Sequence, residues 1–218
     1  MMARRATPAS RAAARERRGA ITDPGPVMDA AARFLEARMR SVHETRQRLL
    51  QAGYPAPLVE EVIGRLVGIG YLDDAAFARA WIESRDRAHP RGATALRREL
   101  TLKGVTPDLI RQALAERHTR GAPAAAFAPP VTAAAAVQGT GGTGRDAAAD
   151  APDADRAAAR RVLDRRSGVL LREADPRRRA GRAYALLARN GFDPDTCREA
   201  VREWAARQPS ATPDDEPA

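Results

Sequence analysis

The chain has 218 residues, a formal net charge of +9, 44% hydrophobic residues and only 4% aromatic residues. Its single cysteine excludes an internal disulfide and a thiolate zinc site, and no apolar run approaches the roughly 18 residues of a membrane helix. We therefore expect a cytoplasmic protein without a membrane span, whose core is built mainly from Leu, Val, Ile and Ala.

Positive charge is concentrated in two parts of the chain. Residues 1–26 contain six arginines against two acidic residues, and residues 156–207 contain 14 arginines against seven acidic residues. This bias predicts a polyanionic partner, either nucleic acid or an acidic protein surface. Residues 1–26 lack apolar periodicity and end in a Pro- and Gly-rich break, so we interpret them as a disordered basic tail rather than a transit peptide.

Residues 27–69 are predicted to form three helices, because their apolar residues recur at helical spacing. Ser41 and Glu44 have the S-x-x-E spacing of a capping box, which predicts that a helix begins there. Gly53 is placed to end that helix, and the third helix is expected to run to Ile69.

The segment from Gly70 to Ala78 joins the third helix to the next one. Gly70 has no Cβ and suits the left-handed residue that ends a helix in a Schellman motif. Asp73 is expected to cap the following helix, and Asp74 adds negative charge at the positive end of its dipole. We interpret the segment as a rigid elbow, defined by Gly70, Tyr71, Leu72, Asp73, Asp74, Phe77 and Ala78.

A three-helix unit recurs along the chain. Three glycines, each four residues after a leucine, mark the same position in each unit: Gly53, Gly104 and Gly191. The second glycine lies 51 residues after the first, and the third lies 87 residues after the second. Residues 118–154, rich in Ala, Gly, Pro and Thr, account for the excess and are expected to be a flexible insertion.

The predicted fold is therefore all-α, with three tandem three-helix repeats in an elongated, curved array, because each small repeat must pack on its neighbour to bury its apolar face. We place repeat 1 at residues 27–69, repeat 2 at 70–117 and repeat 3, which is basic, at 155–207. Residues 208–218 are expected to be a disordered acidic tail.

The elbow is also where the chain resembles a known family. Gly70-Tyr71-Leu72-Asp73-Asp74, followed by Phe77-Ala78, is similar to the signature of the RecX family, bacterial regulators of the RecA recombinase. The segments Ser41 to Gly53 and Gly92 to Gly104 follow the layout of the same family. The resemblance covers Met28 to Arg117 well and Asp155 to Arg207 more loosely.

The resemblance implies tandem three-helix repeats and a regulatory, non-enzymatic protein of homologous recombination, DNA repair and the SOS response. It implies binding to the RecA filament and modulation, most often inhibition, of its recombination and ATPase activities. We expect a monomer without a cofactor, and single- or double-stranded DNA is open as a further partner.

Arginines are the candidate partner-binding residues. One group lies in repeat 3, where Glu173 and Asp175 are the only acidic neighbours in sequence: Arg172, Arg177, Arg178, Arg179, Arg182 and Arg189. A second, partly neutralised group lies in repeat 2: Arg91, Arg97 and Arg98. The alternative interpretation of both groups is a solvated helix face.

Two other functions are weighed against regulation of a recombinase. One is a stand-alone helical DNA-binding protein, although no recognition helix with base-reading side chains is evident. The other is an enzyme that uses Asp73, Asp74 or Cys197, which lack convergent partners in the sequence. A G-x-G-x-x-G at residues 139–144 has no strand before it and is interpreted as part of the insertion.

Overall fold

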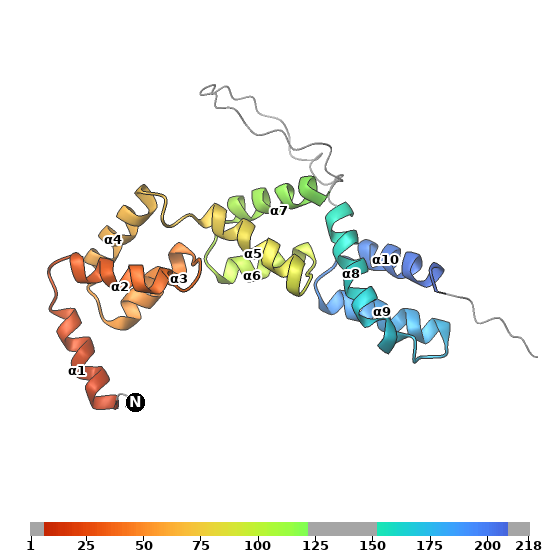
Figure 1. Ribbon diagram of the computed structural model, residues 1–218, viewed down its shortest axis with the longest axis horizontal. Coiled ribbons are helices and arrows are strands. Elements are labelled where there is room, and N and C mark those ends of the chain that lie inside the picture. The colour runs from red at the N-terminus through yellow and green to blue at the C-terminus, as the bar shows by residue number, and fades with distance from the viewer. Residues whose placement is uncertain (1–6, 122–151, 209–218) are drawn as a thin grey trace, which may run out of the picture. The chain divides into compact units, whose positions relative to one another are not determined.

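The structure, a computed structural model, describes residues 7–121 and 152–208 (Figure 1). These residues form ten α-helices and no strand, which confirms the prediction of an all-α fold; the elongated, curved arrangement of the repeats stays a prediction. No helix in these two ranges is long and apolar enough to cross a bilayer. The helices are α1 (Pro8–Gly19), α2 (Gly25–Leu35), α3 (Val42–Ala52), α4 (Ala56–Gly68), α5 (Asp74–Ala88), α6 (Ala93–Leu102), α7 (Pro107–Gly121), α8 (Pro152–Leu170), α9 (Pro176–Arg189) and α10 (Pro194–Ala206).

The chain divides into two compact units, and the division passes through α5, α6 and α7. The first unit contains the residues up to Trp81 together with Glu99–Arg111. The second contains Ile82–Arg98 together with the residues from Gln112 onward. Each unit is described here by itself.

In the first unit, α2, α3 and α4 pack on one another as the predicted repeat 1. The capping box is present at the start of α3: the Glu44 amide donates to Ser41 Oγ over 3.0 Å, and the Ser41 amide donates back to the Glu44 carboxylate over 3.4 Å. The repeat closes around one apolar cluster, formed by Val27, Ala31, Leu49, Val59, Val62, Ile63, Leu66 and Leu72.

The second unit contains the corresponding helices of repeat 3, with α8, α9 and α10 packed pairwise. The core of this repeat combines alanines with larger apolar side chains, and the largest fully buried one among the described residues is Trp204, which is 1% exposed. Trp204 is therefore a core residue. The cluster around it includes Ala158, Leu163, Ala183, Leu187, Phe192, Cys197 and Val201.

The three marker glycines adopt the left-handed conformation, with φ of 98°, 77° and 80° at Gly53, Gly104 and Gly191. In each case the carbonyl of the preceding residue accepts a hydrogen bond from a segment that lies earlier in the chain. The three bonds are Arg18 Nη1 to Ala52 O (3.0 Å), Ser41 Oγ to Lys103 O (2.6 Å) and Gly92 N to Asn190 O (3.1 Å). The glycine that ends each middle helix thus marks a junction as well as a turn.

The N-terminal segment differs from the prediction. Residues 1–26 were expected to be disordered, and this is wrong for Pro8–Gly19, which form α1. Ala and Arg are strong helix formers, Pro8 is at the first helical turn, and Thr7 caps the helix by accepting from the Ser10 amide over 3.3 Å. The chain also packs α1 against the turn at Gly53, where a Cβ would lie 2.4 Å from Arg15 Cγ.

The predicted domain borders shift by a few residues. Helix α2 begins at Gly25, inside the predicted tail; Pro24 occupies the cap position, and Asp23 accepts from the Gly25 amide over 3.1 Å. Helix α7 continues to Gly121 and α8 begins at Pro152, so the predicted insertion at 118–154 is helical at both ends. The rest of that insertion, its G-x-G-x-x-G at residues 139–144 and the predicted tail from residue 209 lie outside the described residues.

Candidate functional site

The elbow has the predicted backbone geometry. Gly70 is left-handed at φ 71°, its amide donates to Val67 O over 2.9 Å, and the Tyr71 amide donates to Leu66 O over 2.9 Å. These two bonds define a Schellman motif. The apolar pair expected with it is incomplete, because Tyr71 is 57% exposed while Leu66 is buried.

The two aspartates of the elbow have different structural roles. Asp73 Oδ1 accepts from the amides of Ala75 and Ala76 at 2.8 and 3.0 Å, as expected for the cap of α5. Asp74 reaches the start of α3, where its Oδ1 accepts from the Val42 amide over 2.9 Å. Burial raises the pKa of Asp74, and this effect outweighs the hydrogen bond from Val42. Both carboxylates are therefore engaged with backbone amides.

Cys197, the third residue of the enzymatic alternative, is a core residue. Its side chain is fully buried, and its Sγ lies 3.6 Å from the carbonyl oxygen of Phe192. Burial, followed by the charge of Asp193, raises the pKa of the thiol to about 11. A nucleophilic cysteine needs the opposite, a lowered pKa and access to substrate.

The candidate arginines of repeat 3 lie in two settings. Glu173 pairs with Arg182 over 2.8 Å, and Asp175 pairs with Arg178 over 3.6 Å, so both neighbouring acids are already engaged. The other four have no ion pair with any described residue: Arg172, Arg177 and Arg189, which are exposed, and Arg179, which is half-buried. The α9 side of the second unit therefore carries a local excess of positive charge.

The candidates of repeat 2 separate from one another. Arg97 and Arg98 are exposed, whereas Arg91 is half-buried and donates from Nη1 to Asn190 Oδ1 over 2.8 Å. Arg97 lines a pocket of the second unit with Asp155, Asp193 and Glu199, whereas Arg91 lies in a second pocket of that unit, beside residues of α8 and α9.

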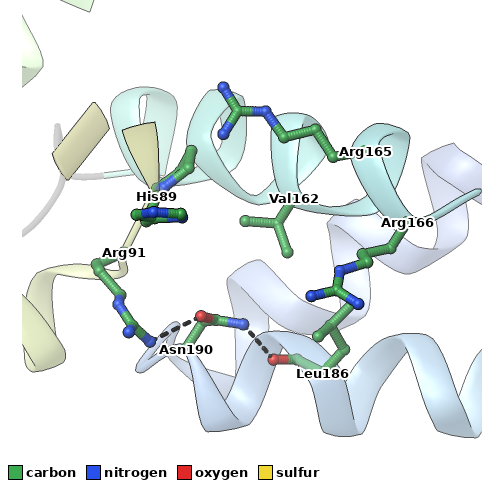
Figure 2. Close-up of a pocket in the computed structure, with 8 residues that line it drawn as sticks. His89, Arg91, Val162, Arg165, Arg166, Leu186 and Asn190 are labelled. Carbon is green, nitrogen blue, oxygen red and sulfur yellow. Dashed lines mark hydrogen bonds between the residues drawn. The ribbon is translucent and has the colours of Figure 1, made fainter. Parts of the chain in front are cut away.

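That pocket, which we call the basic pocket, has a volume of about 240 Å³ (Figure 2). It is lined by the residues that follow α5, by one face of α8, and by the end of α9, and none of these residues is acidic. Figure 2 shows Arg91 joined to Asn190 along one wall, with Val162 and Arg166 projecting from α8. The lining residues are His89, Pro90, Arg91, Val162, Arg165, Arg166, Leu186 and Asn190.

The sequence analysis missed a buried ion-pair cluster in the second unit. The side chain of Arg117 is 4% exposed and donates to both oxygens of Asp86, at 2.8 and 2.9 Å, and to Asp155 Oδ1 at 2.5 Å. The second oxygen of Asp155 accepts from the Ala93 amide over 2.9 Å. Burial alone would lower the pKa of Arg117, but the hydrogen bonds and charges of Asp86 and Asp155 raise it. This cluster ties α5, α6, α7 and α8 together.

Another pocket that the sequence did not indicate lies in the first unit and has arginines in its lining. Its volume is about 300 Å³. Arg48 and Arg40 lie over the ring of Phe34, at 5.9 and 4.4 Å from its centre, and Arg18 lies over the ring of Tyr54 at 5.8 Å. Guanidinium groups over aromatic faces are stabilised by cation–π attraction. One of the lining residues, Arg18, comes from α1, a helix that the sequence did not predict.

Together these features define a class: a protein of tandem three-helix domains with basic surfaces. Two family models match it, "RecX, first three-helix domain" over residues 28–66 and "RecX, second three-helix domain" over residues 73–114. The chain therefore matches the first two RecX domains in their order, and the resemblance to the RecX family is confirmed.

Individual relatives agree. A protein named "Regulatory protein RecX" from Mycobacterium sp. (strain KMS) is 42% identical over 84 residues, which are 38% of this chain and 46% of that protein. Its namesake from Bacillus pumilus (strain SAFR-032) is 37% identical over 83 residues, 38% of this chain and 32% of that protein. The match thus spans less than half the length of these relatives.

The fold likeness extends further along the chain than the sequence match. The crystal structure of RecX from Lactobacillus salivarius has a TM-score of 0.57 and covers 83% of this chain and 95% of its own. At 14% sequence identity, this likeness concerns the fold alone.

Proposed function

We propose that this protein regulates a RecA-type recombinase by binding the filament that the recombinase forms on single-stranded DNA, and that it inhibits strand exchange and ATP hydrolysis. The observation that carries the proposal is the match of residues 28–114 to the first two RecX domains, in their order. The resemblance implies that the family regulates RecA, and the proposal assigns this role to the chain.

The charge of the second unit supports this proposal. A filament of recombinase on DNA presents both acidic protein surface and phosphates, and clustered arginines raise the rate and strength of binding to such a polyanion. Arg172, Arg177 and Arg189 are exposed and not neutralised by any described residue. These three arginines and the neighbouring Arg178 and Arg182 of α9 are therefore our candidates for filament contact.

A second candidate function is binding to DNA without a recombinase. The observation that favours it is the basic pocket, whose lining contains three arginines, one histidine and no acidic residue. The two functions differ in their requirement: only regulation needs the recombinase to be present.

Strand exchange by purified recombinase, measured with and without this protein, tests the proposal. Two triple Arg→Gln variants are matched, because each removes three exposed arginines and two ion pairs from repeat 3. Gln is nearly as good a helix former as Arg, so both variants should fold. The test variant changes Arg177, Arg178 and Arg182; the control changes Arg198, Arg202 and Arg207.

We expect the wild type and the α10 control to inhibit strand exchange, and the α9 variant to inhibit it less. Equal inhibition by both variants would show that these α9 arginines are not part of the contact surface. No effect of the wild-type protein on strand exchange, together with strong binding to naked DNA, would favour the second candidate function.

A further inference from the structure

The pocket of the first unit, which we call the first-unit pocket, has positive charges that no acidic residue of its lining balances. It lies between α1, α2 and α3, and each of these helices contributes one arginine to it: Arg18, Arg33 and Arg48. The rest of the lining consists of apolar and aromatic side chains, and none of the lining residues is acidic. Three cationic side chains therefore share one small, largely apolar space.

One of these three arginines has a structural role in the fold. Arg18 donates from Nη1 to the Ala52 carbonyl over 3.0 Å, at the C-terminal end of α3, and lies over the ring of Tyr54. A positive charge at the C-terminal end of a helix stabilises the helix dipole. The position of Arg18 is therefore explained without a ligand.

Arg33 and Arg48 remain available to a ligand. Both are exposed, and neither has an ion pair or a hydrogen bond with any described residue. Acidic residues lie one helical turn before each of them, Asp29 before Arg33 and Glu44 before Arg48. Glu44 pairs instead with Lys103 over 2.6 Å, and no ion pair joins Asp29 to Arg33. Two guanidinium groups at the pocket are thus left without a counter-charge among the described residues.

The walls of the pocket suit an apolar side chain. Leu49 and the small side chains of Ala30 and Ala52 supply apolar surface. An apolar cavity of about 150 Å³ is large enough to bind benzene. The first-unit pocket, at about 300 Å³, therefore admits one aromatic or branched apolar side chain.

The aromatic rings of the lining are poorly placed to stack a nucleic-acid base. Proteins that bind single strands without sequence preference stack the bases on aromatic faces. Phe34 and Tyr54 are half-buried, and each ring already has a guanidinium group over it, Arg40 at 4.4 Å from the centre of Phe34 and Arg18 at 5.8 Å from that of Tyr54. The lining thus favours a peptide over a nucleic acid.

We propose that the first-unit pocket binds an acidic peptide segment of a partner protein. One aromatic or branched apolar side chain of the peptide enters the pocket, and the carboxylates that flank it pair with Arg33 and Arg48. A guanidinium group donates two parallel hydrogen bonds to a carboxylate, which orients the peptide as well as attracting it. The proposal goes beyond the regulation of a recombinase, because it assigns a ligand class to the first unit and is tested without a recombinase.

Fluorescence anisotropy with a labelled Asp-Glu-Phe-Glu-Asp peptide, added to the full chain, tests the pocket. The test variant is Arg33→Gln, and the matched control is Arg17→Gln. Arg17 is an exposed arginine of α1 that lies outside the pocket and has no ion pair or hydrogen bond with any described residue. Ala30→Leu reduces the pocket without changing the charge. The control ligands are the same peptide with Ala in place of Phe, and a labelled oligo(dT).

We expect the phenylalanine peptide to bind the wild type and Arg17→Gln equally, and to bind Arg33→Gln about two- to fivefold more weakly, the range for one exposed ion pair. Ala30→Leu and the alanine peptide should each weaken binding, because less apolar surface is then buried. Equal effects of Arg33→Gln and Arg17→Gln would overturn the proposal, as would absence of peptide binding by the wild type or equal binding of the two peptides. Tighter binding of oligo(dT), weakened by Arg33→Gln and not by Arg17→Gln, would overturn it in favour of a nucleic acid.

Discussion

Replacing Asp155 by Ala should destabilise the second unit strongly. Its carboxylate, which is 6% exposed, holds the Nη1 group of Arg117 with one oxygen and the Ala93 amide with the other. Losing a hydrogen bond to a charged group costs about 1.5–3 kcal/mol, and a buried amide left without a partner costs about 1–3 kcal/mol. Together the substitution should lower the free energy of unfolding by about 3–5 kcal/mol, the range for a broken buried ion pair.

Asp164→Ala is the matched control, because it breaks an aspartate–arginine pair from the same helix at the surface. Asp164 lies 3.4 Å from Arg207, and both side chains are about half exposed. Such a pair contributes about 0–1 kcal/mol. Urea unfolding followed by circular dichroism measures both variants. Asp155→Asn, which keeps an acceptor for the Ala93 amide, should lie between them. Equal losses for Asp155→Ala and Asp164→Ala would refute the role given to the cluster.

Two further predictions concern the first unit. Gly70→Ala should cost about 1–2 kcal/mol of backbone strain, since Gly70 is left-handed but has open space around it. Gly104→Ala should cost more, because the added Cβ would also lie 2.3 Å from the Cβ of His43; equal melting temperatures would contradict this. For Asp74, burial raises the pKa above its ordinary value of 3.8, so its charged form opposes folding and its contribution to stability declines as pH rises from about 3.8. Asp74→Asn, which keeps an acceptor for the Val42 amide, should therefore gain stability relative to the wild type as the pH rises above about 3.8, whereas Asp74→Ala should lose about 1–3 kcal/mol. Urea midpoints measured at a series of pH values test both expectations, and a difference between Asp74→Asn and the wild type that does not change with pH would contradict the first.

The local features of the fold could be predicted because each depends on a few neighbouring residues. A left-handed turn needs glycine, and the register of Gly53, Gly104 and Gly191 identified all three turns. A capping box needs a fixed spacing, which Ser41 and Glu44 supply. Such signals are complete within four residues, so tertiary packing does not alter them.

The candidate site was less predictable because it depends on packing between distant segments. Arg117 is 31 residues from Asp86 and 38 residues from Asp155, and no spacing rule pairs residues at such separations. The basic pocket is similar, since Arg91 meets residues of α8 and α9 that follow the insertion. The sequence indicated an excess of arginine, but only the fold shows which arginines have acidic partners.

Helix α1 was not predicted, because the expectation of disorder for residues 1–26 was based on their lack of apolar periodicity. Its Ala- and Arg-rich sequence has no continuous apolar face, yet Arg18 bonds the Ala52 carbonyl and lies over the ring of Tyr54. These contacts stabilise a helix through a turn and an aromatic ring instead of an apolar stripe. Tertiary contacts of this kind leave no periodic pattern in the sequence of the helix, so periodicity could not predict it.

The most direct test of the central proposal is the rate of DNA-dependent ATP hydrolysis by recombinase filaments from the same organism, with increasing amounts of this protein. Filaments would be formed on single-stranded DNA before the protein is added, and co-sedimentation would report binding. The proposal predicts that the protein sediments with the filaments and that ATP hydrolysis falls as its concentration rises. An unchanged rate of hydrolysis, with the protein left in the supernatant, would contradict it.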